Sequence, residues 1–172
     1  MTSRYFYKLN CVLLLVCLAV LPVNADVRDI VTHDNYHDFA ASLDAEAHEI
    51  ELDKFLSLMQ QDNVVVFDLR SRQQYERQHI QGAQHLGSDI TAEKLQTLAP
   101  DKEATILLYC QYSFHPVRMM SLTMLSMPQL VRHGYQHVYT LKPVWMGKMD
   151  RYEEALKKLP MTPLAPVAPV EN

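Results

Sequence analysis

The sequence is poor in glycine and cysteine, and it has no apolar stretch long enough to span a membrane. It contains 4 glycines and 3 cysteines in 172 residues. Its longest apolar run covers residues 11–21, whereas a helix needs about 20 apolar residues to cross the hydrocarbon core. Cys11 and Cys17 lie in that run, so the remainder of the chain has one thiol, Cys110. A single thiol has no intramolecular partner, which excludes a structural disulfide within that part.

The N-terminal segment has the pattern of an export signal. Arg4 and Lys8 form a basic start, the apolar run follows, and small residues precede Ala25. This pattern predicts a signal peptide over residues 1–25 that is cleaved after Ala25. We therefore expect an exported protein, periplasmic or secreted, without a stable membrane anchor.

The charge balance is acidic. The net charge of the chain is −4, and it becomes −6 without the two basic residues of the predicted signal. This balance argues against nucleic acid and anionic membranes as partners. The length fits one domain, predicted over residues 48–158, after an N-terminal arm at 26–47. Residues 159–172 are rich in proline and are predicted to form an extended, disordered tail.

Within the predicted domain, strand patterns alternate with helix patterns. Apolar runs predict strands near residues 48–50, 64–67, 82–86, 105–109 and 137–141. Between them, helices are predicted at 52–59, after Thr91, at 117–127 and over a closing stripe from Trp145 to Leu156. We expect the third helix to end or kink at Pro128. This alternation is typical of an α/β domain with a mainly parallel sheet.

Cys110 follows one of these predicted strands directly. It lies after the apolar run 105–109 and before a loop that leads into the predicted helix at 117–127. Sites in such sheets form at the carboxyl ends of the strands. The N–H groups and dipole of a nearby helix N-terminus favour a thiolate. The pattern therefore predicts a reactive cysteine, with a buried cysteine that acts as a small apolar residue as the alternative.

Three segments together resemble the rhodanese (thiosulfate sulfurtransferase) domain. They are the strand segment 64–70 (VVVFDLR), the segment 75–83 (YERQHIQGA) and the strand with its cysteine at 106–110 (ILLYC). The stretch 134–141 (GYQHVYTL) is also similar to that family. The resemblance covers residues 48–158. It implies a rhodanese-like single α/β domain, with a mainly parallel sheet of about five strands and helices on both faces.

Membership of this family implies a specific chemistry. Cys110 would be the catalytic nucleophile, taking a sulfane sulfur from thiosulfate or a related small anionic donor to form a persulfide. The sulfur would then pass to a thiophilic acceptor such as cyanide or a thiol. The resemblance implies no metal and no organic cofactor. It also implies that Asp68 and Arg70 brace the active-site loop as structural support.

The loop after Cys110 differs from the family pattern. Ser113 stands where a glycine is common, and Pro116 stands where a serine or threonine is common. We expect the loop to supply an oxyanion pocket, with His115 or Arg118 as the positive charge. The predicted substrate-binding residues are Gln111, Tyr112, Ser113, Phe114, His115, Val117 and Arg118.

Two other functions for the loop stay open. A catalytically silent rhodanese-fold module would bind a protein partner through the aromatic side chains of Tyr112 and Phe114. A redox protein would cycle Cys110 through a sulfenic acid or a mixed disulfide. A phosphatase loop of the form Cys-x5-Arg is not matched, because seven residues separate Cys110 from Arg118.

Metal binding is the less favoured interpretation of two further patterns. Met119, Met120, Met124 and Met127 are soft ligands suited to Cu(I), although methionine is a common core residue at helical spacing. His33 and His37 have i, i+4 spacing but no clear third ligand. We therefore predict no metal site.

Overall fold

The computed structural model describes residues 41–116, 121–146 and 149–166. Its five parallel strands lie in the order β1-β5-β4-β2-β3. The strands are β1 (Glu49–Ile50), β2 (Val64–Asp68), β3 (Gln84–His85), β4 (Thr105–Tyr109) and β5 (His137–Leu141). The helices are α2 (Ala45–His48), α3 (Leu52–Leu58), α4 (Arg72–Arg77), α5 (Ala92–Leu98), α6 (Gln111–Phe114), α7 (Leu122–Arg132), the 3-10 helix η2 (Val144–Met146) and α8 (Met149–Lys158).

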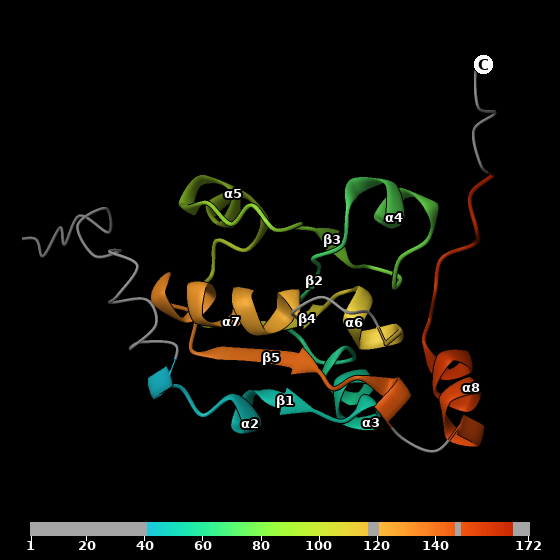
Figure 1. The fold of residues 1–172 in the computed structure, drawn as a ribbon. Helices are drawn as coiled ribbons and strands as arrows, with labels where there is room; N and C mark the ends of the chain where they lie inside the picture. The colour runs from blue at the N-terminus through green and yellow to red at the C-terminus, as the bar shows by residue number, and fades with distance from the viewer. Residues whose placement is uncertain (1–40, 117–120, 147–148, 167–172) are drawn as a thin grey trace, which may run out of the picture.

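The sheet is covered by helices on both faces, which confirms the predicted fold class (Figure 1). On one face, Phe67, Ile106 and Leu108 pack with side chains from α5 and α7. On the other face, Val66 and Leu107 pack with side chains from α3 and the end of α8. The central strands are apolar at every core position because both of their faces are buried.

Hydrogen bonds at the carboxyl ends of the strands bring three loops together. The Leu69 N–H donates to the Tyr109 carbonyl, and the Leu86 and Gly87 N–H groups both donate to the Asp68 carbonyl, each at 3.0 Å. The segments that follow β2, β3 and β4 therefore meet at one edge of the sheet. Cys110 lies at this edge, directly after β4.

The region after Cys110 differs from its prediction. A short helix, α6, begins at once, and α7 continues through Pro128 to Arg132 instead of ending there. Pro128 has no N–H to donate within the helix. However, Pro128, Met127 and Leu130 are all buried, and this packing offsets the missing hydrogen bond. The predicted start of the helix at residue 117 lies outside the described residues.

The prediction placed Trp145 on the closing helix. In the structure, Trp145 lies in the separate 3-10 helix η2. Its indole Nε1–H donates to the Tyr112 carbonyl oxygen at 2.6 Å. A sequence stripe at helical spacing cannot reveal the break that separates η2 from α8. The indole therefore anchors the segment that carries α6 and is not part of α8.

The described part of the predicted tail, residues 159–166, forms hydrogen bonds with the domain. The Gln81 N–H donates to the Pro160 carbonyl at 2.7 Å, and the Thr162 N–H donates to the His79 carbonyl at 2.8 Å. Leu159 is buried, with 5% of its surface exposed. Residues 159–166, which we call the C-terminal strap, thus lie along residues 77–81. The prolines remove donors from the strap, but its carbonyls and the remaining N–H groups still find partners there.

The described end of the predicted arm also belongs to the domain. Leu43 of the arm packs against the core, and α2 begins in the arm at Ala45 and ends at His48, whose Nδ1 contacts the Val138 carbonyl at 2.7 Å. The predicted signal peptide lies outside the described residues, as do residues 26–40 and 167–172. No helix within the described ranges is long and apolar enough to cross a bilayer.

Candidate active site

Cys110 lines a cavity of about 590 Å³ at the carboxyl edge of the sheet. The cavity walls come from the ends of β2, β3 and β4 with the loops that follow them, and from α4, α5, α6 and α7. Cys110 is 1% exposed, and it borders this cavity. A sulfur atom here is shielded from bulk water but open to a ligand that enters the cavity.

The backbone and side chain of Ser113 position Cys110. Cys110 is the N-terminal cap residue of α6: its carbonyl accepts the Ser113 N–H at 3.1 Å, and its own N–H donates to Ser113 Oγ at 3.2 Å. On the other side, the Cys110 Sγ lies 3.9 Å from the hydroxyl oxygen of Ser121, which is 2.6 Å from Thr123 Oγ1. The Ser121 hydroxyl is therefore placed near the sulfur and can stabilise a negative charge on it.

A buried ion pair lies directly beneath this loop. The Arg70 guanidinium donates to the Asp68 carboxylate from Nη2 at 2.6 Å and from Nε at 3.0 Å. The Tyr109 hydroxyl donates to Asp68 Oδ2 at 2.8 Å, and it accepts the Ile80 N–H at 3.1 Å. Arg70 Nη2 also donates to the Gln78 carbonyl at 2.6 Å. This network joins the ends of β2 and β4 to the segment before β3.

Burial and neighbouring charges set the protonation states of Tyr109 and Arg70. Burial, together with the negative charge of Asp68, raises the pKa of the Tyr109 hydroxyl far above its usual value. Burial lowers the pKa of Arg70, but its hydrogen bonds to Asp68 outweigh this effect and raise the pKa overall. Tyr109 therefore stays protonated and Arg70 stays charged at physiological pH. The ion pair of Asp68 and Arg70 thus lies beside the start of the Cys110 loop, and Arg70 also lines the cavity.

The predicted loop residues separate into two groups. Gln111 and Tyr112 line the cavity with Cys110. Ser113 and Phe114 are buried behind the loop, and Phe114 packs 5.4 Å from the Tyr109 ring and 5.5 Å from the Arg70 guanidinium. Phe114, predicted as a substrate-binding residue and as an aromatic contact for a protein partner, is therefore buried and does not line the Cys110 cavity. Its position in the sequence could not reveal that the short helix α6 turns this side chain inward.

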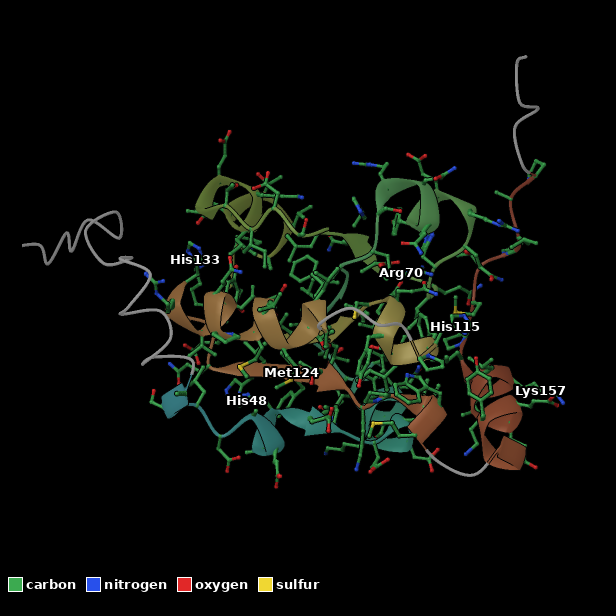
Figure 2. The ribbon with its side chains drawn as sticks, viewed as in Figure 1. His48, Arg70, His115, Met124, His133 and Lys157 are labelled. Carbon is green, nitrogen blue, oxygen red and sulfur yellow. The ribbon has the colours of Figure 1, made fainter. Side chains whose placement is uncertain are left out.

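His115 is also in a different place from the one predicted. It is exposed, its Nδ1 lies in hydrogen-bond contact with the Tyr152 hydroxyl at 2.9 Å, and it lines a second cavity, of about 430 Å³. Figure 2 shows it between α6 and α8, away from the Cys110 cavity. Extended backbone after α6 sends its side chain to that side. The other predicted residues, Val117 and Arg118, lie outside the described residues.

Two basic residues of the cavity were not predicted. Arg72 and Lys94 both line it, from α4 and α5. The Lys94 ammonium donates to the carbonyl oxygens of Leu86 and, at 3.4 Å, Asp89. Arg72 is exposed and lies 3.8 Å from Glu76. The position of Arg72 soon after β2 could have pointed to this edge of the sheet, whereas Lys94 lies on α5, well after β3, and no local sequence pattern marks it.

His85 is the remaining polar side chain of note in the cavity. Its Nε2–H donates to the Arg70 carbonyl at 2.9 Å, while its buried Nδ1 has no hydrogen-bond partner in the part of the chain that the structure describes. Over the same residues, no three His, Cys, Asp or Glu side chains are grouped so as to hold a metal ion.

A parallel α/β domain with a cysteine in the loop after a central strand, braced by a buried Asp-Arg pair, defines the class of protein. The family model of the rhodanese-like domain matches residues 51–146. The chain therefore belongs to the rhodanese-like family.

Known members of this family support the assignment. The chain is 33% identical over 86 residues to the thiosulfate sulfurtransferase GlpE of several Coxiella burnetii strains; the match covers 49% of this chain and 70% of the relative. The crystal structure of the Alr3790 protein from Anabaena has a TM-score of 0.50 at 18% identity, over 67% of this chain and 92% of that one. The first match supports the sulfurtransferase family, and the second supports the fold.

Proposed function

We propose that this chain is an exported sulfurtransferase that carries sulfane sulfur as a persulfide on Cys110. The observation that carries the proposal is the position of the Cys110 thiol. It lines a ligand-sized cavity at the start of α6 and lies 3.9 Å from the Ser121 hydroxyl oxygen. The similarity to thiosulfate sulfurtransferases is consistent with this chemistry.

The proposed reaction has two steps. With thiosulfate as donor, the Cys110 thiolate attacks the sulfane sulfur, the S–S bond of the donor breaks, and sulfite leaves with the bonding electrons. An acceptor, such as cyanide, then attacks the outer sulfur of the persulfide. The new C–S bond gives thiocyanate, and the Cys110 thiolate leaves with the electron pair of the broken S–S bond. Each sulfur transfer is therefore balanced without an external oxidant or reductant.

The surroundings of Cys110 suit both steps. The persulfide is an anion, and the N–H and hydroxyl groups near the sulfur of Cys110 can hold it. The ammonium of Lys94, on the opposing α5 wall, attracts anionic donors. The buried pair of Asp68 and Arg70 keeps the loop in the geometry that the attack requires.

The export part of the proposal rests on residues 1–25. Their basic start, apolar run and small residues before Ala25 have the order of a signal peptide. Expression of the full chain in a bacterium with two membranes, followed by fractionation and intact mass of the product, tests it. We expect a periplasmic product that begins at Asp26. A full-length product in the cytoplasmic fraction would contradict export and leave the sulfur chemistry untouched.

Intact-mass spectrometry tests the persulfide directly. The protein without its predicted signal peptide is incubated with thiosulfate beside its Cys110→Ala variant. We expect a gain of one sulfur atom, about 32 Da, on the parent protein alone, and its loss on addition of cyanide. If no donor of sulfane sulfur, thiosulfate or organic persulfide, adds sulfur to Cys110, the proposal is wrong.

A further inference from the structure

The second cavity, which His115 lines, is a separate space of ligand size. Its volume is about 430 Å³, within the range of about 300–1,000 Å³ found for pockets that bind small organic molecules. Its walls come from the end of α6, α8, the C-terminal strap and the segments after β2 and α4. Among the described residues, Arg70 alone lines both this cavity and the Cys110 cavity.

Most of the wall of the second cavity is apolar. Leu156 of α8 lines it with Leu159 and Met161 of the strap, and Phe114 of α6 completes this part of the wall. Phe114 and Leu159 are buried, and the other two side chains are half-buried. Such a wall stabilises a ligand that places carbon atoms against it. It offers a small inorganic ion no replacement for its lost hydration.

The charge on the wall is positive. Arg70 and His115 are basic, and no Asp or Glu lines the cavity in the described ranges. Arg70 Nε and Nη2 donate to Asp68 and to the Gln78 carbonyl, but Nη1 has no acceptor among the described residues. Two of the five N–H donors of the guanidinium therefore remain available. Because the Arg70 side chain is 8% exposed, water competes little for a charged acceptor that reaches it.

His115 supplies a second polar contact. Its Nδ1 lies 2.9 Å from the Tyr152 hydroxyl, which holds the ring between α6 and α8 (Figure 2). Its Nε2 has no hydrogen-bond partner in the part of the chain that the structure describes. When the Tyr152 hydroxyl donates to Nδ1, the neutral ring carries its proton on Nε2, and the charged ring carries a proton on both nitrogens. Both forms present an N–H donor at Nε2.

Hydrogen bonds hold the walls of the second cavity together. Gln78, which lines it, donates from Nε2 to the Thr162 carbonyl of the strap at 3.0 Å. Gln81 donates from its N–H to the Pro160 carbonyl at 2.7 Å. The strap is therefore fixed before a ligand arrives, and binding does not have to order it.

From these observations we infer that the second cavity binds a small organic carboxylate with an apolar body, at a site separate from Cys110. The carboxylate accepts hydrogen bonds from Arg70 Nη1 and His115 Nε2, and the apolar body packs on Leu156, Leu159 and Met161. An uncharged apolar ligand would leave both donors without an acceptor, and an inorganic anion would leave the apolar wall uncovered. This binding site requires no sulfur chemistry.

Isothermal titration calorimetry with three probes tests the chemistry of the ligand. The protein without its predicted signal peptide is titrated with octanoate, with acetate, which lacks the apolar body, and with octanamide, which lacks the charge. We expect octanoate to bind at least about tenfold more tightly than acetate and about fivefold more tightly than octanamide. If octanoate does not bind at millimolar concentration, or binds no more tightly than either of the other probes, the inference is wrong.

The same substitution at three positions locates the site. Leu156→Glu places a carboxylate in the second cavity and should weaken octanoate binding at least about tenfold. Leu122→Glu places the same charge in the Cys110 cavity, and Leu164→Glu places it on an exposed part of the strap. Both should leave the affinity within about twofold. A larger loss for Leu122→Glu than for Leu156→Glu would assign octanoate to the Cys110 cavity and overturn the inference.

His115→Ala tests the polar contact without altering the core, because His115 is exposed. We expect it to weaken octanoate binding about fivefold and to leave octanamide binding unchanged. Equal effects on octanoate and octanamide, or no effect on octanoate, would contradict the role of His115 in binding the carboxylate. Urea unfolding of each variant, compared with the parent protein, verifies that the loss of binding is not a loss of folded protein.

Discussion

The buried network under the active-site loop gives the sharpest stability prediction. Asp68 is fully buried, and it accepts hydrogen bonds from Arg70 and Tyr109. Asp68→Ala leaves the guanidinium of Arg70, which is 8% exposed, with the Gln78 carbonyl as its remaining acceptor among the described residues. Removal of one partner of a buried ion pair costs about 3–5 kcal/mol. We expect Asp68→Ala to lower the free energy of unfolding by about 4 kcal/mol.

Urea-induced unfolding, followed by the fluorescence of Trp145, the single tryptophan, measures this loss. The double variant Asp68→Ala/Arg70→Met should be more stable than Asp68→Ala, because it leaves no buried charge without a partner. The control is Glu51→Ala, which breaks the exposed pair with Lys142 and should cost less than about 1 kcal/mol. A cost for Asp68→Ala no greater than that of the control would refute the reasoning.

Three further variants test other parts of the structure. Ser113→Ala removes the acceptor of the Cys110 N–H. We expect the free energy of unfolding in urea to fall by about 1–2 kcal/mol and the loading of sulfur onto Cys110 to slow. Unchanged loading would contradict the role of Ser113. Burial, with the positive charges of Lys102 and Arg132, lowers the pKa of His133. As the pH falls, His133 therefore binds a proton in the unfolded chain at a higher pH than in the folded protein. The free energy of unfolding decreases over this pH range. His133→Gln should lose less stability than the parent protein between about pH 7.5 and about pH 5.5; equal losses would exclude this effect. Leu159→Ala in the C-terminal strap should lower the free energy of unfolding by about 2–4 kcal/mol. Its control is Leu164→Ala, at a residue that is 61% exposed, which should lower it by less than about 0.5 kcal/mol. Similar losses for both variants would show that the strap contributes little.

The sheet could be predicted because its central strands are buried on both faces. The apolar runs at β2 and β4 are continuous, and each is bounded by polar residues or turns. The rule that sites lie at the carboxyl ends of parallel strands then located Cys110 at the active edge. The short helix α6 could not be predicted, because four residues are too few to establish a helical period.

The missed features share a physical cause, which is that they depend on contacts between distant segments. The prediction sought positive charge only in the loop after Cys110, whereas Lys94 reaches the cavity from α5. Similarly, the prolines after residue 159 indicated disorder, but the strap pairs with residues 77–81 through its other backbone groups. Local composition cannot reveal either contact, since the partner lies elsewhere in the sequence.

Single-turnover sulfur transfer tests the central claim most directly. The parent protein is loaded with an excess of sulfane-sulfur donor, freed of the donor by gel filtration, and mixed with cyanide. We predict one thiocyanate per chain, with peptide mapping that locates the transferred sulfur on Cys110 before the addition, and no thiocyanate from Cys110→Ala. Thiocyanate in equal yield from Cys110→Ala, or none from the loaded parent protein, would contradict the account.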